Sequence, residues 1–262
     1  MVEQKEKEKL PQTYGMGQLL ALKYDKFDLQ GEWFDIFGKP ERGVTWFLWG
    51  ASGSGKSTVC SRLVKMFLEI NQRVLYLSLE EKRGESITRK LEDAGVTAKD
   101  RNFKLLASAT LQELILRLRK RNSPDVIFVD SLQYIKMSYD EYKKLHELFP
   151  SKTFIIISHA TGANPKGAAG EGVHYDAGVK IWVEGGIIEA KHRFEGGGGK
   201  KVIIPSLAEK FKLGRSEEMK EEQLAIYWQF LREHDLLAEF GRYVEQFDYK
   251  LGMFRGKRRR RK

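Results

Sequence analysis

One segment of eight residues constrains this 262-residue chain more than any other. Residues 50–57 read Gly-Ala-Ser-Gly-Ser-Gly-Lys-Ser, which fits the pattern G-x-x-x-x-G-K-[ST] at every fixed position. An apolar run over residues 45–49 precedes the segment, and an amphipathic pattern over residues 56–70 follows it. Glycine tolerates positive φ, so backbone N–H groups in such a turn can surround phosphate oxygens at the start of the next helix. The segment therefore predicts a phosphate-binding loop between a strand and a helix.

This loop predicts that the chain binds a nucleoside triphosphate, ATP first of all, together with Mg²⁺. Lys56 would supply positive charge to the β- and γ-phosphates, and the Ser57 hydroxyl would bind Mg²⁺. Asp130 ends the apolar run 126–130, and a carboxylate at the carboxyl end of a central parallel strand lies beside such a loop. Asp130 is therefore the second expected Mg²⁺ ligand. The nucleotide-binding residues are predicted to be Gly50, Ala51, Ser52, Gly53, Ser54, Gly55, Lys56, Ser57 and Thr58.

Polar side chains at the ends of two other expected strands complete the predicted catalytic set. Glu80 and Glu81 follow the apolar run 73–79, where a carboxylate can orient and deprotonate the attacking water; we favour Glu80 for this role. His159 follows the run 153–158 and could contact the γ-phosphate.

Two cations lie further along the chain. Lys191 and Arg193 have the i, i+2 spacing that places two side chains on one face of a strand, and on spacing alone they are two ordinary surface cations.

Short apolar runs alternate with helical patterns, which predicts an α/β fold with a mostly parallel central sheet flanked by helices. Helices are expected at 85–94, 111–121 and 140–148, and a third strand at 103–107. Strands at 179–184 and 187–194 form an expected hairpin around Gly185 and Gly186. Residues 161–172 are expected to be a flexible loop, and residues 196–199 a flexible tip before a strand at 201–205.

The predicted organisation has four parts. Residues 1–30 are a partly disordered lead-in, 31–206 the ATPase core, 207–250 a small helical appendage, and 251–262 a basic disordered tail. The last eight residues carry seven of the basic side chains, which leaves +3 of the net charge of +10 for the rest of the chain. Such a tail can bind phosphate backbones, or it can simply increase solubility.

The composition indicates in which cellular compartment the protein is expected. The one cysteine, Cys60, excludes an internal disulfide and a multi-cysteine zinc site, which favours a reducing, cytoplasmic location. No run approaches the roughly 18 apolar residues of a membrane helix, so no membrane association is expected.

In this order, the motifs resemble the RecA-fold ATPases, most closely the bacterial RadA/DnaB branch. The similar segments are Tyr76-Leu-Ser-Leu-Glu-Glu81, Asp130-Ser-Leu-Gln133, His159-Ala-Thr161 and Lys191-His-Arg-Phe194, and the resemblance covers residues 33–205. It implies an oligomer, ring or filament, in which Lys191 and Arg193 reach the γ-phosphate of a neighbouring subunit. It also implies that residues 161–172, with Lys166, contact single-stranded DNA.

The chain departs from the RadA pattern at several points. The zinc-binding cysteines and the large C-terminal domain of RadA are absent, Gly162 replaces a lysine and Glu195 replaces a glycine. The chain therefore looks most like the minimal RecA-core proteins of phages and mobile elements, which act in DNA recombination, repair or strand annealing. A hexameric replicative-type helicase and a KaiC-like regulatory ATPase without nucleic acid are the alternatives. A small-molecule kinase would need an arginine-rich lid, for which the sequence has no clear candidate.

Overall fold

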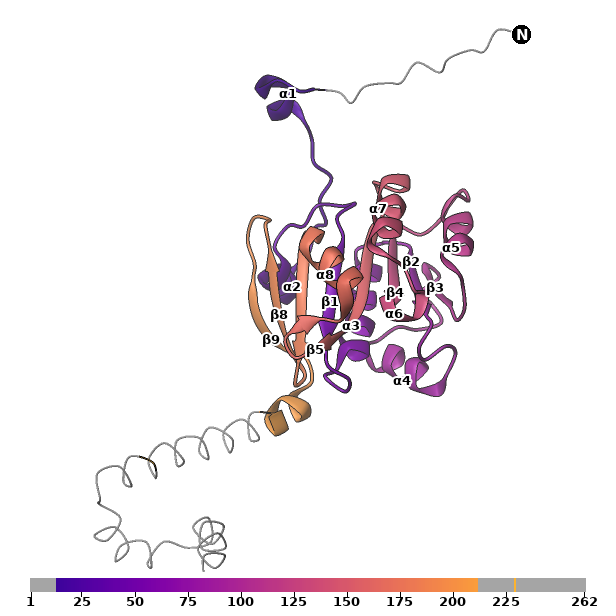
Figure 1. Cartoon of the computed structure of the whole chain (residues 1–262), viewed down its shortest axis with the longest axis vertical. Helices are drawn as coiled ribbons and strands as arrows, with labels where there is room; N and C mark the ends of the chain where they lie inside the picture. The colour runs from indigo at the N-terminus through magenta and orange to yellow at the C-terminus, as the bar shows by residue number, and fades with distance from the viewer. Residues whose placement is uncertain (1–12, 212–228, 230–262) are drawn as a thin grey trace, which may run out of the picture. The chain divides into compact units, whose positions relative to one another are not determined.

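The computed structural model describes residues 13–211 and residue 229, and the chain divides after Pro205 into two units. The first unit is built on one sheet with the strand order β3-β2-β4-β5-β1-β7-β8-β9 (Figure 1). The strands are β1 (Trp46–Gly50), β2 (Val74–Ser78), β3 (Phe103–Leu106), β4 (Val126–Asp130), β5 (Thr153–Thr161), β6 (Asn164–Pro165), β7 (Val179–Glu184), β8 (Ile187–His192) and β9 (Gly199–Val202). The helices are α1 (Met16–Ala21), α2 (Gly31–Phe37), α3 (Lys56–Glu69), α4 (Glu85–Asp93), α5 (Leu111–Leu118), α6 (Leu132–Ile135), α7 (Tyr139–Leu148) and α8 (Gly167–Asp176).

Six neighbouring strands, from β3 to β7, run parallel, and β8 and β9 add antiparallel to one side. The short β6 pairs with the end of β5. The predicted α/β class, with a mostly parallel sheet flanked by helices, is therefore confirmed. We call the ends of the parallel strands that lead into the glycine-rich loop the carboxyl edge of the sheet, and their opposite ends the amino edge.

Alternation along the strands divides the core between the two faces of the sheet. Trp46, Tyr76 and Phe128 belong to one buried cluster, which also includes the apolar side of α3. Phe47, Leu75 and Ile127 belong to a second cluster, into which α5, α7 and α8 contribute apolar side chains. Because both faces are covered, β1, β2 and β4 are buried along their whole length, as their apolar sequences predict.

Local sequence signals explain where several helices begin. Thr110 accepts a hydrogen bond from the backbone N–H of Glu113, whose carboxylate in turn accepts from Thr110, so a capping box starts α5. Ser138 and Glu141 start α7 in the same way. The helix expected at 111–121 ends early, at Leu118, and a turn follows in which Asn122 has a positive φ of 60°.

The prediction of a flexible loop at residues 161–172 is wrong. This stretch contains β6 and the first half of α8. Its glycines allow close packing rather than mobility: a Cβ on Gly172 would lie 2.7 Å from the Tyr139 ring, and one on Gly170 would lie 3.3 Å from Pro165. Glycine content alone could not distinguish a mobile loop from a closely packed helix.

The expected flexible tip at 196–199 is also packed. A Cβ on Gly197 would collide with the backbone of Gly38, and the N–H of Gly198 donates to the carbonyl of Ile36 at 2.8 Å. The following strand, β9, begins earlier than expected, at Gly199, and ends at Val202.

The structure describes only part of the two ends of the chain. Phe27 and Leu29 are buried in the core, so ordered packing begins before the expected boundary at residue 31. Residues 1–12, most of the expected appendage at 207–250 and the whole basic tail at 251–262 lie outside the described residues. Within the described part of the chain, no helix is long and apolar enough to cross a membrane.

Candidate active site

The glycine-rich loop leaves β1 at the carboxyl edge and enters α3. Gly53 and Gly55 have positive φ of 73° and 103°, and Gly55 is the N-cap of α3. A Cβ on Gly50 would collide with the carbonyl of Val183, so only glycine allows β1 and β7 to approach here. The N–H of Gly186 donates to the carbonyl of Ser54 at 3.0 Å, which anchors the loop to the β7–β8 turn. The loop is thus held at a helix N-terminus, the backbone arrangement that binds phosphate.

Lys56 is the first residue of α3 and folds back over this loop. Its Nζ donates to the carbonyls of Gly50 and Ala51 at 2.9 and 2.8 Å. Burial lowers the pKa of Lys56, while the carboxylates of Glu80 and Asp130 act in the opposite direction. The ammonium is therefore held by the loop at a place where an anionic ligand would favour its charged form.

Asp130 lies at the end of β4, where the sequence predicted it. Its carboxylate is 5% exposed and accepts a 2.7 Å hydrogen bond from the hydroxyl of Tyr76 on the neighbouring β2. Burial raises the pKa of Asp130 to about 6; Tyr76 opposes this shift, and the charges of Glu80 and Glu81 add to it. A buried carboxylate with carboxylate neighbours favours a bound cation, and together with the Ser57 hydroxyl it offers the hard oxygen ligands that Mg²⁺ prefers.

The two glutamates after β2 have different surroundings. Lys90 of α4 donates to both carboxylate oxygens of Glu81, at 2.7 and 2.9 Å. Burial raises the pKa of Glu81, but hydrogen bonds from Lys90, Ser86 and Ser57 outweigh it and leave this pKa below its usual value. Glu80 is 40% exposed and has its carboxylate 3.6 Å from Nε2 of His159. Glu80 is therefore the less constrained of the two carboxylates.

His159 on β5 connects this carboxylate to a polar network. Burial lowers the pKa of His159, so the imidazole is neutral near pH 7. The backbone N–H of His159 donates to Oε1 of Gln133 at 3.3 Å, and Nε2 of Gln133 donates to Ser158 Oγ at 2.8 Å and to the carbonyl of Lys166 at 3.3 Å. The sequence predicted no role for Gln133 beyond its place in the resemblance. Its polar side chain three residues after Asp130 was the only signal.

Lys191 and Arg193 are not brought to this site. In register, His192 of β8 pairs with Val179 of β7, which pairs with Trp46 at the start of β1. The loop begins at Gly50, four residues further along β1, so about 13 Å of strand separates the two levels. Lys191 is 77% exposed, and the Arg193 guanidinium lies 3.4 Å from the carbonyl of Asp176.

Comparison with protein-family models gives a match over the nucleotide-binding part of the chain. A family model described as an AAA domain matches residues 44–159, a stretch that runs from just before β1 to His159. No curated protein matches the chain. Together with the sheet topology and the loop geometry, this match indicates the class: the chain carries a P-loop NTPase domain of the ATPase type.

Proteins of this class bind ATP with Mg²⁺, a group that polarises the transferred phosphoryl and neutralises its developing charge. The matched stretch contains the loop, Glu80, Asp130 and His159, and it ends before Lys191 and Arg193. The roles of individual site residues, and the RadA/DnaB branch in particular, remain predictions.

Proposed function

We propose that the protein is a Mg²⁺-dependent ATPase of the RecA/RadA type that acts on single-stranded DNA in recombination, repair or strand annealing. The observation that carries this proposal is the network around Gln133. It links His159, beside Glu80, to the backbone of Lys166 at the start of α8, and the N–H of Lys166 also donates to the carbonyl of His159 at 2.9 Å. A change at the γ-phosphate can thus reach the segment 161–172 through three hydrogen bonds.

Within this proposal, each residue of the site has a defined role. Lys56 binds the β- and γ-phosphates, Ser57 and Asp130 hold Mg²⁺, and Glu80 orients the attacking water for in-line displacement. His159 responds to the γ-phosphate and passes the change to Gln133. Lys166, which is exposed, contacts the DNA backbone.

The proposal also requires self-association. Lys191 and Arg193 lie toward the amino edge and away from the loop of their own subunit, so they could stabilise transition-state charge only at a neighbouring subunit. A ring and a filament both satisfy this requirement.

The test is ATP hydrolysis with and without single-stranded DNA, each at low and high salt. We expect stimulation that weakens as salt rises, because phosphate contacts release counterions. Gln133→Ala should keep DNA binding and lose most of the stimulation, because the network is broken while the basic side chains remain. Gln112→Ala, which removes the same kind of side chain from an exposed position on α5, is the matched control and should be stimulated normally.

Two other outcomes would favour the alternative functions. Strand unwinding by closed hexamers would favour the ring helicase. A hydrolysis rate that does not respond to DNA at either salt concentration would contradict the nucleic-acid role and favour a regulatory ATPase that acts on a protein partner.

A further inference from the structure

A concave site lies at the amino edge of the sheet, on the side opposite the phosphate-binding loop. It has a volume of about 300 Å³ and lies between the ends of β2, β3 and α5. We call it the amino-edge pocket; it is lined by Arg73, Val74, Leu75, Arg101, Asn102, Lys104, Arg117, Lys120, Arg121, Asn122, Ser123 and Pro124. From Val74 to Ser78 the strand β2 advances about 13 Å, so this pocket at its start is separate from the nucleotide site at its end.

The lining of the amino-edge pocket has charge of one sign. Six of its residues are arginine or lysine, and none is aspartate or glutamate. The other two described pockets mix both signs: one includes Glu41, Glu147 and Arg193, and the other includes Glu81 and Arg83. A concave surface whose charged side chains are all cations focuses a positive potential and attracts anions.

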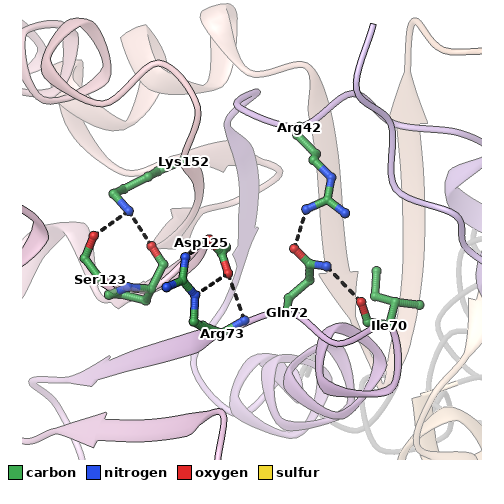
Figure 2. Close-up of polar contacts among 8 residues, drawn as sticks. Arg42, Ile70, Gln72, Arg73, Ser123, Asp125 and Lys152 are labelled. Carbon is green, nitrogen blue, oxygen red and sulfur yellow. Dashed lines mark hydrogen bonds and ion pairs between the residues drawn. The ribbon is translucent and has the colours of Figure 1, made fainter. Parts of the chain in front are cut away.

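One of the six cations, Arg73, forms an ion pair within the protein. Arg73 at the start of β2 donates from Nε and one terminal nitrogen to the carboxylate of Asp125, at 2.8 and 2.6 Å (Figure 2). Lys152 donates to Ser123 Oγ at 2.8 Å and to the carbonyl of Pro124 at 2.6 Å, which holds the neighbouring chain segment (Figure 2). These contacts fix one wall of the pocket before any ligand binds.

The other five cations have no such partner. Arg101, Lys104, Arg117, Lys120 and Arg121 are exposed, and none of them forms an ion pair with another described residue. Cations at a helix C-terminus stabilise the helix, which would account for the three at the end of α5. Arg101 and Lys104 come from the turn before β3 and from β3 itself, so helix stabilisation does not explain why they gather at the same pocket.

We propose that the amino-edge pocket binds the phosphate backbone of single-stranded nucleic acid. This proposal rests on the proposed function, and it gives that function a docking surface away from the segment 161–172. The unpaired guanidinium and ammonium groups would neutralise successive phosphates, and Asn102 and Asn122 would add neutral hydrogen-bond donors. No aromatic side chain lines the pocket, so bases would not stack there and binding would not depend on sequence.

The experiment is fluorescence anisotropy of the full chain with labelled single-stranded DNA over a range of salt concentrations. The test variant is Arg117→Gln, Lys120→Gln, Arg121→Gln. The control is Arg89→Gln, Lys143→Gln, Lys144→Gln, which removes the same charge from exposed positions on α4 and α7. All six side chains are exposed, so both proteins should fold, and thermal unfolding of each confirms this.

We expect the test variant to bind DNA on the order of tenfold or more weaker than the wild type, because each lost phosphate contact removes its share of counterion release. The slope of log affinity against log salt should fall by about 2, at roughly 0.7 per lost contact. The control should stay within about twofold of the wild type, and all three proteins should hydrolyse ATP equally without DNA.

Each other outcome has a defined meaning. If the test variant binds DNA as well as the control, the amino-edge proposal is overturned and the proposed function stands. If the wild type does not bind single-stranded DNA, the proposed function fails and this proposal fails with it. Wild-type binding of inorganic polyphosphate but not of DNA overturns the nucleic-acid assignment in favour of a free phosphate ligand.

Discussion

At the carboxyl edge of the sheet, cations and carboxylates face one another; in the amino-edge pocket, cations gather and no carboxylate lines the surface. At the first edge the carboxylates of Glu80 and Asp130 act on the pKa of Lys56, the charges of Lys56 and Glu80 act on the pKa of Asp130, and Lys90 binds Glu81. At the second edge, Asp125 pairs with Arg73 and five further cations remain unpaired among the described residues. The site with charges of both signs suits a metal and a reaction, while the pocket with charges of one sign suits a polyanion.

The most severe expected effect is loss of hydrolysis at the carboxyl edge. Lys56→Ala removes the only cation held within the loop, and we expect hydrolysis to fall at least about a thousandfold, because charge on the transferred phosphoryl is no longer stabilised. A phosphate-release assay measures this loss. DNA binding without nucleotide should be unchanged, and a parallel loss of DNA binding would contradict the separation of the two edges.

Arg193→Ala tests whether the two edges meet between subunits. We expect turnover to fall on the order of a thousandfold while nucleotide binding by the single subunit survives. Mixing Arg193→Ala with Lys56→Ala subunits should restore part of the activity, because an intact loop then meets an intact Arg193 from the neighbour. Full turnover by Arg193→Ala alone would show that the assignment in trans is wrong.

Asp130→Asn should lower the rate of ATP hydrolysis and increase the stability of the nucleotide-free protein. Burial raises the pKa of Asp130 to about 6 from 3.8, so the folded protein binds a proton more tightly than the unfolded chain. The stability this group contributes is present at low pH and is lost as pH rises from about 4 to about 6.

The variant should therefore increase the free energy of unfolding of the nucleotide-free protein at pH 7 by up to about 3 kcal/mol, at about 1.4 kcal/mol per pKa unit. The gain should disappear near pH 4, and hydrolysis should fall about a hundredfold or more. Denaturant unfolding at the two pH values measures the gain. An equal gain at both pH values would contradict the assigned cause.

The smallest expected effect belongs to the ion pair at the amino edge. Asp125→Asn should lower the free energy of unfolding by about 1 kcal/mol, because the side chains of Arg73 and Asp125 are 42% and 34% exposed and water screens the pair. The rate of ATP hydrolysis should not change. Glu85→Gln, which breaks the more exposed pair with Arg89, is the control and should cost less.

The nucleotide-binding end of the fold was the most predictable part of the protein. The loop pattern, the buried strand ending in Asp130 and the apolar runs of β1 and β2 each depend on local sequence, and each lies where it was expected. The β7–β8 hairpin around Gly185 and Gly186 was predicted for the same reason, although β8 ends at His192, two residues before the expected end.

Elements whose character depends on distant neighbours were predicted poorly. Residues 161–172 read as a mobile loop because glycine and alanine have little to bury, yet Tyr139 and Pro165 supply the surfaces against which Gly172 and Gly170 pack. The helix α2 and the burial of Phe27 were not foreseen, since polar and glycine residues around them hide the signal.

The sequence by itself determined the phosphate-binding loop, the identity of its cation and the strand that presents the buried carboxylate, because each follows from backbone conformation and side-chain pattern within a few residues. Only the tertiary structure decided that Glu81 is bound by Lys90 while Glu80 faces His159, and that Gln133 joins β5 to the start of α8. It also brought six cations from three segments to one pocket. These pairings join residues far apart in the chain, and strand order and helix packing, which no local pattern encodes, place them together.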